Sequence, residues 1–122
     1  MQRAAEIYGS DESFYLINGS SCGILSAVSA CVPRRGEILI ARNCHKAAYY
    51  AVLQNELKAE YVYPQEIESL GIPGGILPED VDKRLEENPD IRAVLIVSPT
   101  FDGMVSDIKK IAENVHRRAK IL

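Results

Sequence analysis

The sequence predicts an α/β fold in which a mostly parallel sheet is covered by helices on both faces. Short apolar runs alternate with stretches of helical periodicity along the 122 residues, as in chains of strand–helix–strand units. Two of the runs, residues 38–40 and 93–97, contain no polar residue, which is typical of strands buried on both faces. Polar segments follow these runs directly, and parallel sheets gather their ligands at that edge.

The composition indicates one globular domain and limits the kinds of binding partner that we expect. Apolar residues make up 47% of the chain and charged residues 25%. The net charge of −3 argues against nucleic acid or an anionic membrane as a partner, and no apolar run is long enough to cross a bilayer. Cys22, Cys31 and Cys44 lack the spacing of a disulfide framework or a zinc site. We therefore expect a cytoplasmic protein without a metal site.

The first third of the chain predicts two helices around one strand. Residues 2–8 resemble the end of a helix that stops at Gly9, so that the chain is expected to begin inside a longer structure. Residues 14–17 are the first predicted strand, and a helix is expected to begin near Ser21 and to end at Pro33. Its apolar residues recur at helical spacing: Ile24, Leu25, Val28 and Val32.

The middle third predicts two strands and one helix. The strand at residues 38–40 is followed by a polar segment and then by a helix over residues 47–57. Residues 61–63 form a short third strand. Residues 64–77 are too rich in glycine for regular structure, and we expect a loop there.

The last third predicts two helices on either side of the strand at 93–97. Pro78 opens the first helix, because proline suits the first helical position, and residues 88–90 stop it. Ser106 is the expected N-cap of the second helix, and residues 120–122 resemble the start of another buried strand. The apolar stripe of the second helix consists of Ile108, Ile111, Ala112 and Val115.

The segment Asn18-Gly19-Ser20-Ser21-Cys22-Gly23 has the composition of an anion-binding turn. A tight turn at a helix start leaves backbone N–H groups free at the positive end of the helix dipole. Its glycines remove steric obstacles and its serines add donors, so that a phosphate is the best-fitting anion. A capped turn that binds no ligand has a similar sequence, and both interpretations remain open on this motif alone.

Three motifs, in this order, resemble those of pyridoxal-phosphate-dependent enzymes of the aspartate-aminotransferase fold. The resemblance is strongest to the bacterial Orn/Lys/Arg decarboxylase group and covers essentially the whole chain. It implies a partial large domain, truncated at both ends. The motifs are N-G-S-S-C-G at residues 18–23, R-N-C-H-K-A at 42–47 and S-P-T-F-D-G at 98–103.

The resemblance implies a role for each motif in binding pyridoxal 5'-phosphate. Gly19, Ser20 and Ser21 would hold the cofactor phosphate. His45 would stack on the pyridine ring and is the candidate catalytic residue, and Thr100 would lie near the polar edge of the ring. From the residues alone, a histidine after a strand is more often a hydrogen-bonding or solvent-exposed loop residue, and a threonine can merely satisfy loop backbone groups.

The chain also departs from the family pattern. Ala47 stands where the family usually has a serine. The family's aspartate, which pairs with the pyridine nitrogen, and its Schiff-base lysine have no counterpart among these residues, and Lys46 does not match the lysine position. We therefore expect this chain to be inactive alone, and the cofactor to belong to the full-length enzyme.

The resemblance implies a lyase that releases CO2 from ornithine, lysine or arginine, in amino-acid metabolism and polyamine biosynthesis. The expected partners are a small amino-acid substrate and further copies of the chain. An unpaired apolar strand at residues 14–17 would favour such self-association. Two alternatives remain: another enzyme of this fold, such as an aminotransferase or cysteine desulfurase, or a self-contained, non-enzymatic α/β phosphate-binding domain.

Overall fold

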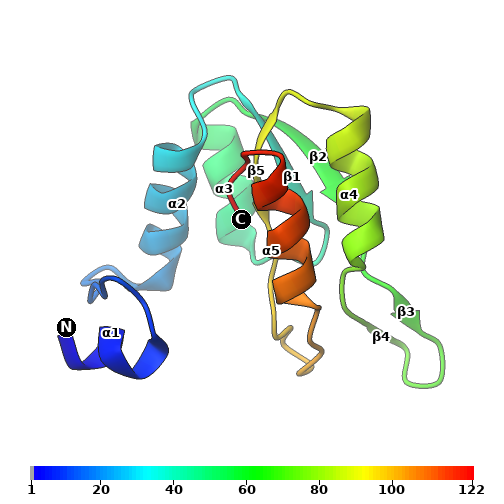
Figure 1. The fold of residues 1–122 in the computed structure, drawn as a ribbon, viewed down its shortest axis with the longest axis horizontal. Helices are drawn as coiled ribbons and strands as arrows, with labels where there is room; N and C mark the ends of the chain where they lie inside the picture. Colours follow the sequence, from blue (N-terminus) through cyan, green and yellow to red (C-terminus); the bar gives the residue numbers. More distant parts are fainter. Residues whose placement is uncertain (1) are drawn as a thin grey trace.

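Three parallel strands form the centre of the computed structural model, which describes residues 2–122 (Figure 1). Their order is β2 (Lys58–Val62), β1 (Glu37–Ala41) and β5 (Ile91–Leu95). Leu39 of the central strand pairs with Glu60 on one side and with Val94 on the other. Ile121 forms a parallel bridge to Ala93 on the outer side of β5, as expected from the apolar end of the sequence.

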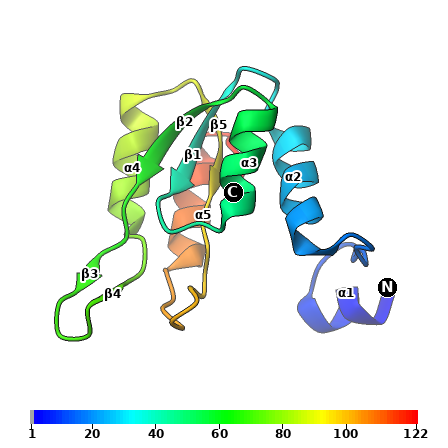
Figure 2. The same cartoon turned by 180° about the vertical axis from the view of Figure 1, so that it is seen from behind.

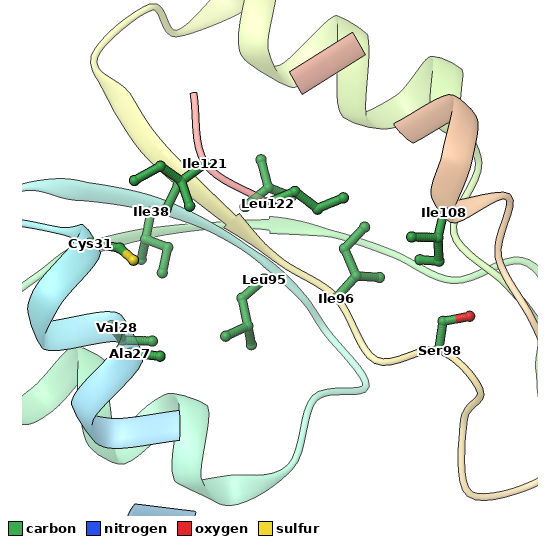
Figure 3. Close-up of a pocket in the computed structure, with 12 residues that line it drawn as sticks. Ala27, Val28, Cys31, Ile38, Leu95, Ile96, Ser98, Ile108, Ile121 and Leu122 are labelled. Carbon is green, nitrogen blue, oxygen red and sulfur yellow. The ribbon is translucent and has the colours of Figure 1, made fainter. Parts of the chain in front are cut away.

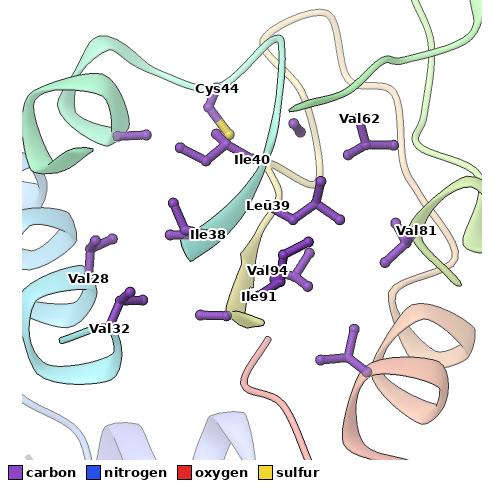
Figure 4. Close-up of a cluster of buried hydrophobic side chains, with 14 of the residues drawn as sticks. Val28, Val32, Ile38, Leu39, Ile40, Cys44, Val62, Val81, Ile91 and Val94 are labelled. Carbon is purple, nitrogen blue, oxygen red and sulfur yellow. The ribbon is translucent and has the colours of Figure 1, made fainter. Parts of the chain in front are cut away.

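Helices cover both faces of this sheet, which confirms the predicted fold class. Helices α2 (Gly19–Cys31) and α3 (Lys46–Gln54) pack together on one face. Helices α4 (Pro78–Glu87) and α5 (Ile108–Arg117) pack together on the other (Figures 1 and 2). Figure 4 shows Val28 and Val32 of α2 on one side of the strands and Val81 of α4 on the other.

The core lies between the sheet and these four helices. In β1 every side chain from residue 38 to residue 41 is buried, because the strand is central and both of its faces are covered. The helices contribute the apolar residues that recur every three or four positions. The largest fully buried side chains are Ile38, Leu39, Ile40, Ile91, Ile111, Val32, Val81 and Val115.

The predicted first strand at residues 14–17 is wrong, because this segment has no regular structure. Phe14 is 72% exposed and Ile17 is fully exposed. A strand exists only where a neighbour accepts its backbone hydrogen bonds, and none of the described strands lies beside this segment. The four apolar side chains of residues 14–17 are exposed, and self-association through this segment stays a prediction.

The glycine-rich segment at residues 64–77 contains a small hairpin instead of an irregular loop. Strand β3 (Glu66–Ile67) pairs antiparallel with β4 (Ile72–Pro73). Gly71 has a φ of 64° in the connecting turn, a conformation that glycine adopts without strain. The glycine content therefore indicates a tight chain reversal between two short strands and not an irregular loop.

Several predicted boundaries shift by a few residues. Helix α1 (Gln2–Tyr8) ends at Gly9 as predicted, with a φ of 64° at the glycine. Helix α2 begins at residue 19 instead of 21, and α3 ends at residue 54 instead of 57. The strands predicted at residues 61–63 and 93–97 begin three and two residues earlier, as β2 and β5, and end one and two residues earlier.

The N-cap of α5 is Asp107 and not Ser106. The Asp107 side chain accepts a hydrogen bond from the Lys110 backbone N–H at 3.0 Å. The Ser106 hydroxyl instead accepts from the Ile76 N–H at 2.9 Å. Both residue types are good caps, and Ser106 is engaged by the segment that precedes α4.

Within residues 2–122 no helix has the length and hydropathy needed to span a membrane. The same residues contain no group of three or more His, Cys, Asp or Glu side chains arranged to hold a metal ion. The three cysteines are free thiols.

Candidate functional site

The three motifs all lie at the carboxyl edge of the sheet. Strands β1 and β5 run parallel, so that the segments at residues 42–46 and 98–103 leave the sheet at the same edge. The C-terminus of α2 leads through residues 32–36 into the amino end of β1, which places the N-terminus of α2 at that edge as well (Figure 1).

The α2 N-terminus has the features of an open anion cradle. Gly19 has a φ of 74°, and a Cβ added there would meet no atom within 4 Å. The Asn18 side chain makes no capping hydrogen bond, so that it does not compete for the N–H groups of the first turn. Gly19, Ser20 and Ser21 are exposed. These donors fit a phosphate, which accepts several hydrogen bonds and favours the positive end of a helix.

Gly23 has a packing role behind this cradle. A Cβ at this position would lie 2.5 Å from Cδ1 of Leu16. The glycine therefore allows the Leu16 side chain to lie against α2. This contact accounts for the last residue of the N-G-S-S-C-G motif without a ligand.

His45 caps helix α3 and remains exposed. Its Nδ1 accepts a hydrogen bond from the Ala47 N–H at 3.2 Å. A ring nitrogen that accepts carries no proton, so that the proton of the neutral ring lies on Nε2. The hydrogen-bonding role left open by the sequence is thus confirmed, and the exposed ring is still accessible to a ligand.

Cys44 fixes the same turn to the neighbouring strand, a role that the sequence did not reveal. Its thiol donates to the backbone oxygen of Leu95 at 3.6 Å. Burial raises the pKa of the Cys44 thiol to about 11, which keeps it a neutral donor at pH 7. The turn that carries His45 is therefore tied to the end of β5.

Thr100 satisfies backbone groups of the third motif. Its hydroxyl oxygen accepts from the Met104 N–H at 3.1 Å, and its own N–H donates to the Met104 oxygen at 2.8 Å. The interpretation that this threonine satisfies loop backbone groups is therefore confirmed, and its role at the cofactor stays a prediction. The hydroxyl proton is left free to donate to a ligand, because the oxygen acts only as an acceptor here.

The predicted residues share an edge but not a cavity. Within residues 2–122 no hydrogen bond joins the cradle, His45 and Thr100 to one another. An apolar cavity of about 370 Å³ lies between α2 and β5 (Figure 3), where Ala27, Cys31 and Leu95 face one another. A second cavity, of about 500 Å³, lies between Arg42 and the β3–β4 hairpin. None of the predicted residues lines either cavity, so that the candidate site is an open edge.

The sequence matches a family model along its whole length. The model describes the major domain of Orn/Lys/Arg decarboxylases and covers residues 1–122. An arginine decarboxylase of Halalkalibacterium halodurans is 33% identical over 115 residues, which are 94% of this chain and 23% of that protein. An arginine decarboxylase of Bacillus subtilis is 34% identical over 93% of this chain and 23% of its own length. The chain thus spans about a quarter of these relatives.

Solved structures agree with the fold. Lysine decarboxylase A from Pseudomonas aeruginosa matches 98% of this chain with a TM-score of 0.80 and 24% identity, over 17% of its own length. A C–S lyase from Staphylococcus hominis with bound pyridoxal phosphate matches 84% of this chain, over 27% of its own length, with a TM-score of 0.68 and 17% identity. On the strength of the family match along its whole length, the chain belongs to the Orn/Lys/Arg decarboxylase family.

Proposed function

We propose that this chain is part of the large domain of a pyridoxal-phosphate-dependent decarboxylase that acts on arginine, lysine or ornithine. The observation that carries the proposal is the placement of three family-like motifs at one sheet edge. The names of the relatives, arginine and lysine decarboxylases, support the substrate class. Because the chain spans about a quarter of the first relatives, the activity belongs to the longer protein.

The cradle at Gly19, Ser20 and Ser21 would bind the phosphate of the cofactor. Backbone N–H groups of the first turn and two hydroxyls supply neutral donors, and the helix dipole adds a favourable field. When bound, pyridoxal phosphate supplies an electron sink for the carbon atom that loses CO2. The cradle itself only binds and orients.

His45 would hold the aromatic ring of the cofactor by stacking. The hydrogen bond from Ala47 to its Nδ1 fixes the neutral tautomer and limits the rotation of the ring. Thr100 would donate its free hydroxyl proton to the polar edge of the same ring. These residues position a cofactor, and no residue here matches the lysine that would bind its aldehyde.

The test is an assay of the longer protein with pyridoxal phosphate and each of the three basic amino acids. We expect CO2 release from at least one of them, and a loss of ten-fold or more in His45→Ala. Lys46→Ala, next to the candidate residue, is the matched control and should retain activity. The absence of CO2 release from all three amino acids would contradict the proposal.

The 122-residue chain should release no CO2 by itself, because it lacks a counterpart of the aldehyde-binding lysine. Family membership favours a decarboxylase over an aminotransferase or cysteine desulfurase, although the fold is common to several such enzymes. A keto-acid product from the longer protein, without CO2, would favour an aminotransferase.

A further inference from the structure

We propose that Arg42 and Tyr49 are positioning residues that fix the turn carrying His45. This inference rests on the proposed role of His45 at the cofactor ring. The turn runs from the end of β1 to the start of α3, and Arg42 is its first residue. If His45 is to stack on a ring, the direction in which this turn leaves the sheet must be fixed.

Two hydrogen bonds join Arg42 and Tyr49 in both directions. The Tyr49 hydroxyl donates to the backbone oxygen of Arg42 at 2.7 Å. The guanidinium Nη1 of Arg42 donates to the same hydroxyl oxygen at 2.7 Å. The hydroxyl thereby acts as one donor and one acceptor, so that a single group holds both the main chain and the side chain of Arg42.

The Arg42 guanidinium also lies near the aromatic rings of Tyr49 and Tyr61. Its carbon lies 5.4 Å from the centre of the Tyr49 ring and 5.6 Å from that of Tyr61. The two rings are stacked, with centres 6.3 Å apart and an angle of 24° between their planes. Both distances fall within the range of cation–π attraction. Because Tyr61 belongs to β2 and Tyr49 to α3, this cluster joins a strand to a helix.

The position of Tyr49 in α3 couples the cluster to His45. Tyr49 follows His45 by four residues, so that the two lie one helical turn apart on the same side of α3. The bond from the Tyr49 hydroxyl to the Arg42 oxygen therefore links α3 to the first residue of the turn. The bond from the Ala47 N–H to His45 links α3 to the last residue of the turn. Two further bonds tie the turn to the neighbouring strands and not to α3: the Arg42 N–H donates to the Val62 oxygen, and the Cys44 thiol donates to the Leu95 oxygen.

Tyr49→Phe tests this inference because it keeps the ring and removes the hydroxyl. We would measure amide hydrogen exchange in the 122-residue chain without cofactor. The informative amides are Cys44, which donates to the Ala41 oxygen, and Ala47, which donates to His45. We expect their exchange to rise about ten-fold, the equivalent of one lost hydrogen bond, while the amide of Ile111 in α5 stays unchanged.

Tyr50→Phe is the matched control, because Tyr50 is the next residue on α3 and is exposed. A second readout is the tautomer of the His45 ring, followed by nitrogen NMR, with His116 as reference in the same spectrum. Tyr49→Phe should shift His45 away from its single tautomer and leave His116 unchanged. Arg42→Gln, which removes the guanidinium beside the two rings, should also accelerate exchange at Cys44.

The inference is overturned if exchange at Cys44 and Ala47 does not change in Tyr49→Phe, or if it rises equally at Ile111. An equal rise would mean that the tyrosine stabilises only the whole fold. The exchange measurement needs no cofactor, so that its result is independent of the decarboxylation assay. A local rise in exchange together with a failed assay would reject the proposed function but support the positioning role of Arg42 and Tyr49.

Discussion

The turns that carry the cradle and His45 are held to very different degrees. Ile40, just before the His45 turn, is fully buried in the central strand. Ile17, just before the cradle, is fully exposed in a segment without regular structure. The His45 turn is tied to β2, to β5 and to α3. The His45 turn is therefore bonded to three neighbouring elements because the strand before it is paired on both sides, whereas the segment before the cradle has no paired neighbour.

The largest expected difference between the two regions comes from truncating these two isoleucines. Ile40→Ala should lower the free energy of unfolding by about 2–5 kcal/mol, because it removes buried methyl groups and leaves a cavity. Ile17→Ala should change it by less than about 0.5 kcal/mol. Urea unfolding of both variants measures the contrast. Equal losses in the two variants would show that residue 17 is buried in solution.

The next effect is a loss of stability at alkaline pH caused by Cys44. Burial raises the pKa of its thiol to about 11, so that the folded state binds the proton more tightly than the unfolded state. The stabilisation is complete below the unfolded pKa of about 8.5 and is lost as the pH rises to about 11. At about 1.4 kcal/mol for each pH unit between the two pKa values, the total loss should be about 3 kcal/mol.

Cys44→Ala should remove this alkaline slope, at the cost of a lower stability at pH 7. Cys22→Ala, at a half-buried position near the cradle, serves as the control and should retain the slope. Denaturant unfolding at several pH values between 8 and 11 gives the comparison. An unchanged slope in Cys44→Ala would contradict the assignment.

The backbone of the cradle gives a smaller effect. Gly19→Ala should cost about 1 kcal/mol, because a φ of 74° is unfavourable for alanine. The added methyl group meets no atom, so that the cost is purely conformational. Ser20→Ala, the next residue, should cost less than about 0.5 kcal/mol. A cost above about 3 kcal/mol for Gly19→Ala would indicate a packed environment instead of an open one.

An effect of similar size separates the two roles of His45. His45→Ala should lower stability by about 1 kcal/mol, because the Ala47 N–H loses its acceptor. His45→Asn should restore most of that loss, since asparagine caps helices well, but it cannot stack as an imidazole does. Thermal unfolding measures the cap. If the asparagine variant is as unstable as the alanine variant, the cap is not the stabilising contact.

The sequence predicts strands well where the pattern depends only on burial. The runs at residues 38–40 and 93–97 are apolar throughout, and each overlaps a strand in the sheet. Residues 14–17 have a similar pattern, yet a strand also needs a partner, and no local signal identifies one. Adjacent capping residues likewise compete: Asp107 and Ser106 have similar propensities, and the contact of Ser106 with Ile76 decides between them.

The candidate site was predictable in its placement but not in its supports. The rule that parallel strands end at one edge brings the three motifs together. The hydrogen bond from Cys44 to Leu95 joins residues that are 51 positions apart in the sequence, and no sequence motif predicts it. A second support is the cluster formed by Arg42, Tyr49 and Tyr61. It exists only because a side chain of α3 contacts a side chain of β2, and the sequence alone does not distinguish these residues from ordinary surface and core residues.

The most direct test of the cofactor site is an NMR titration of the isotope-labelled chain with pyridoxine 5'-phosphate, which lacks the aldehyde that would react with lysines. We predict chemical-shift changes at residues 19–21, at residues 45–47 and at Thr100 together. Pyridoxine without phosphate should lose the changes at residues 19–21. Shift changes confined to other parts of the chain, or equal changes with both compounds at the cradle, would contradict the proposed binding site.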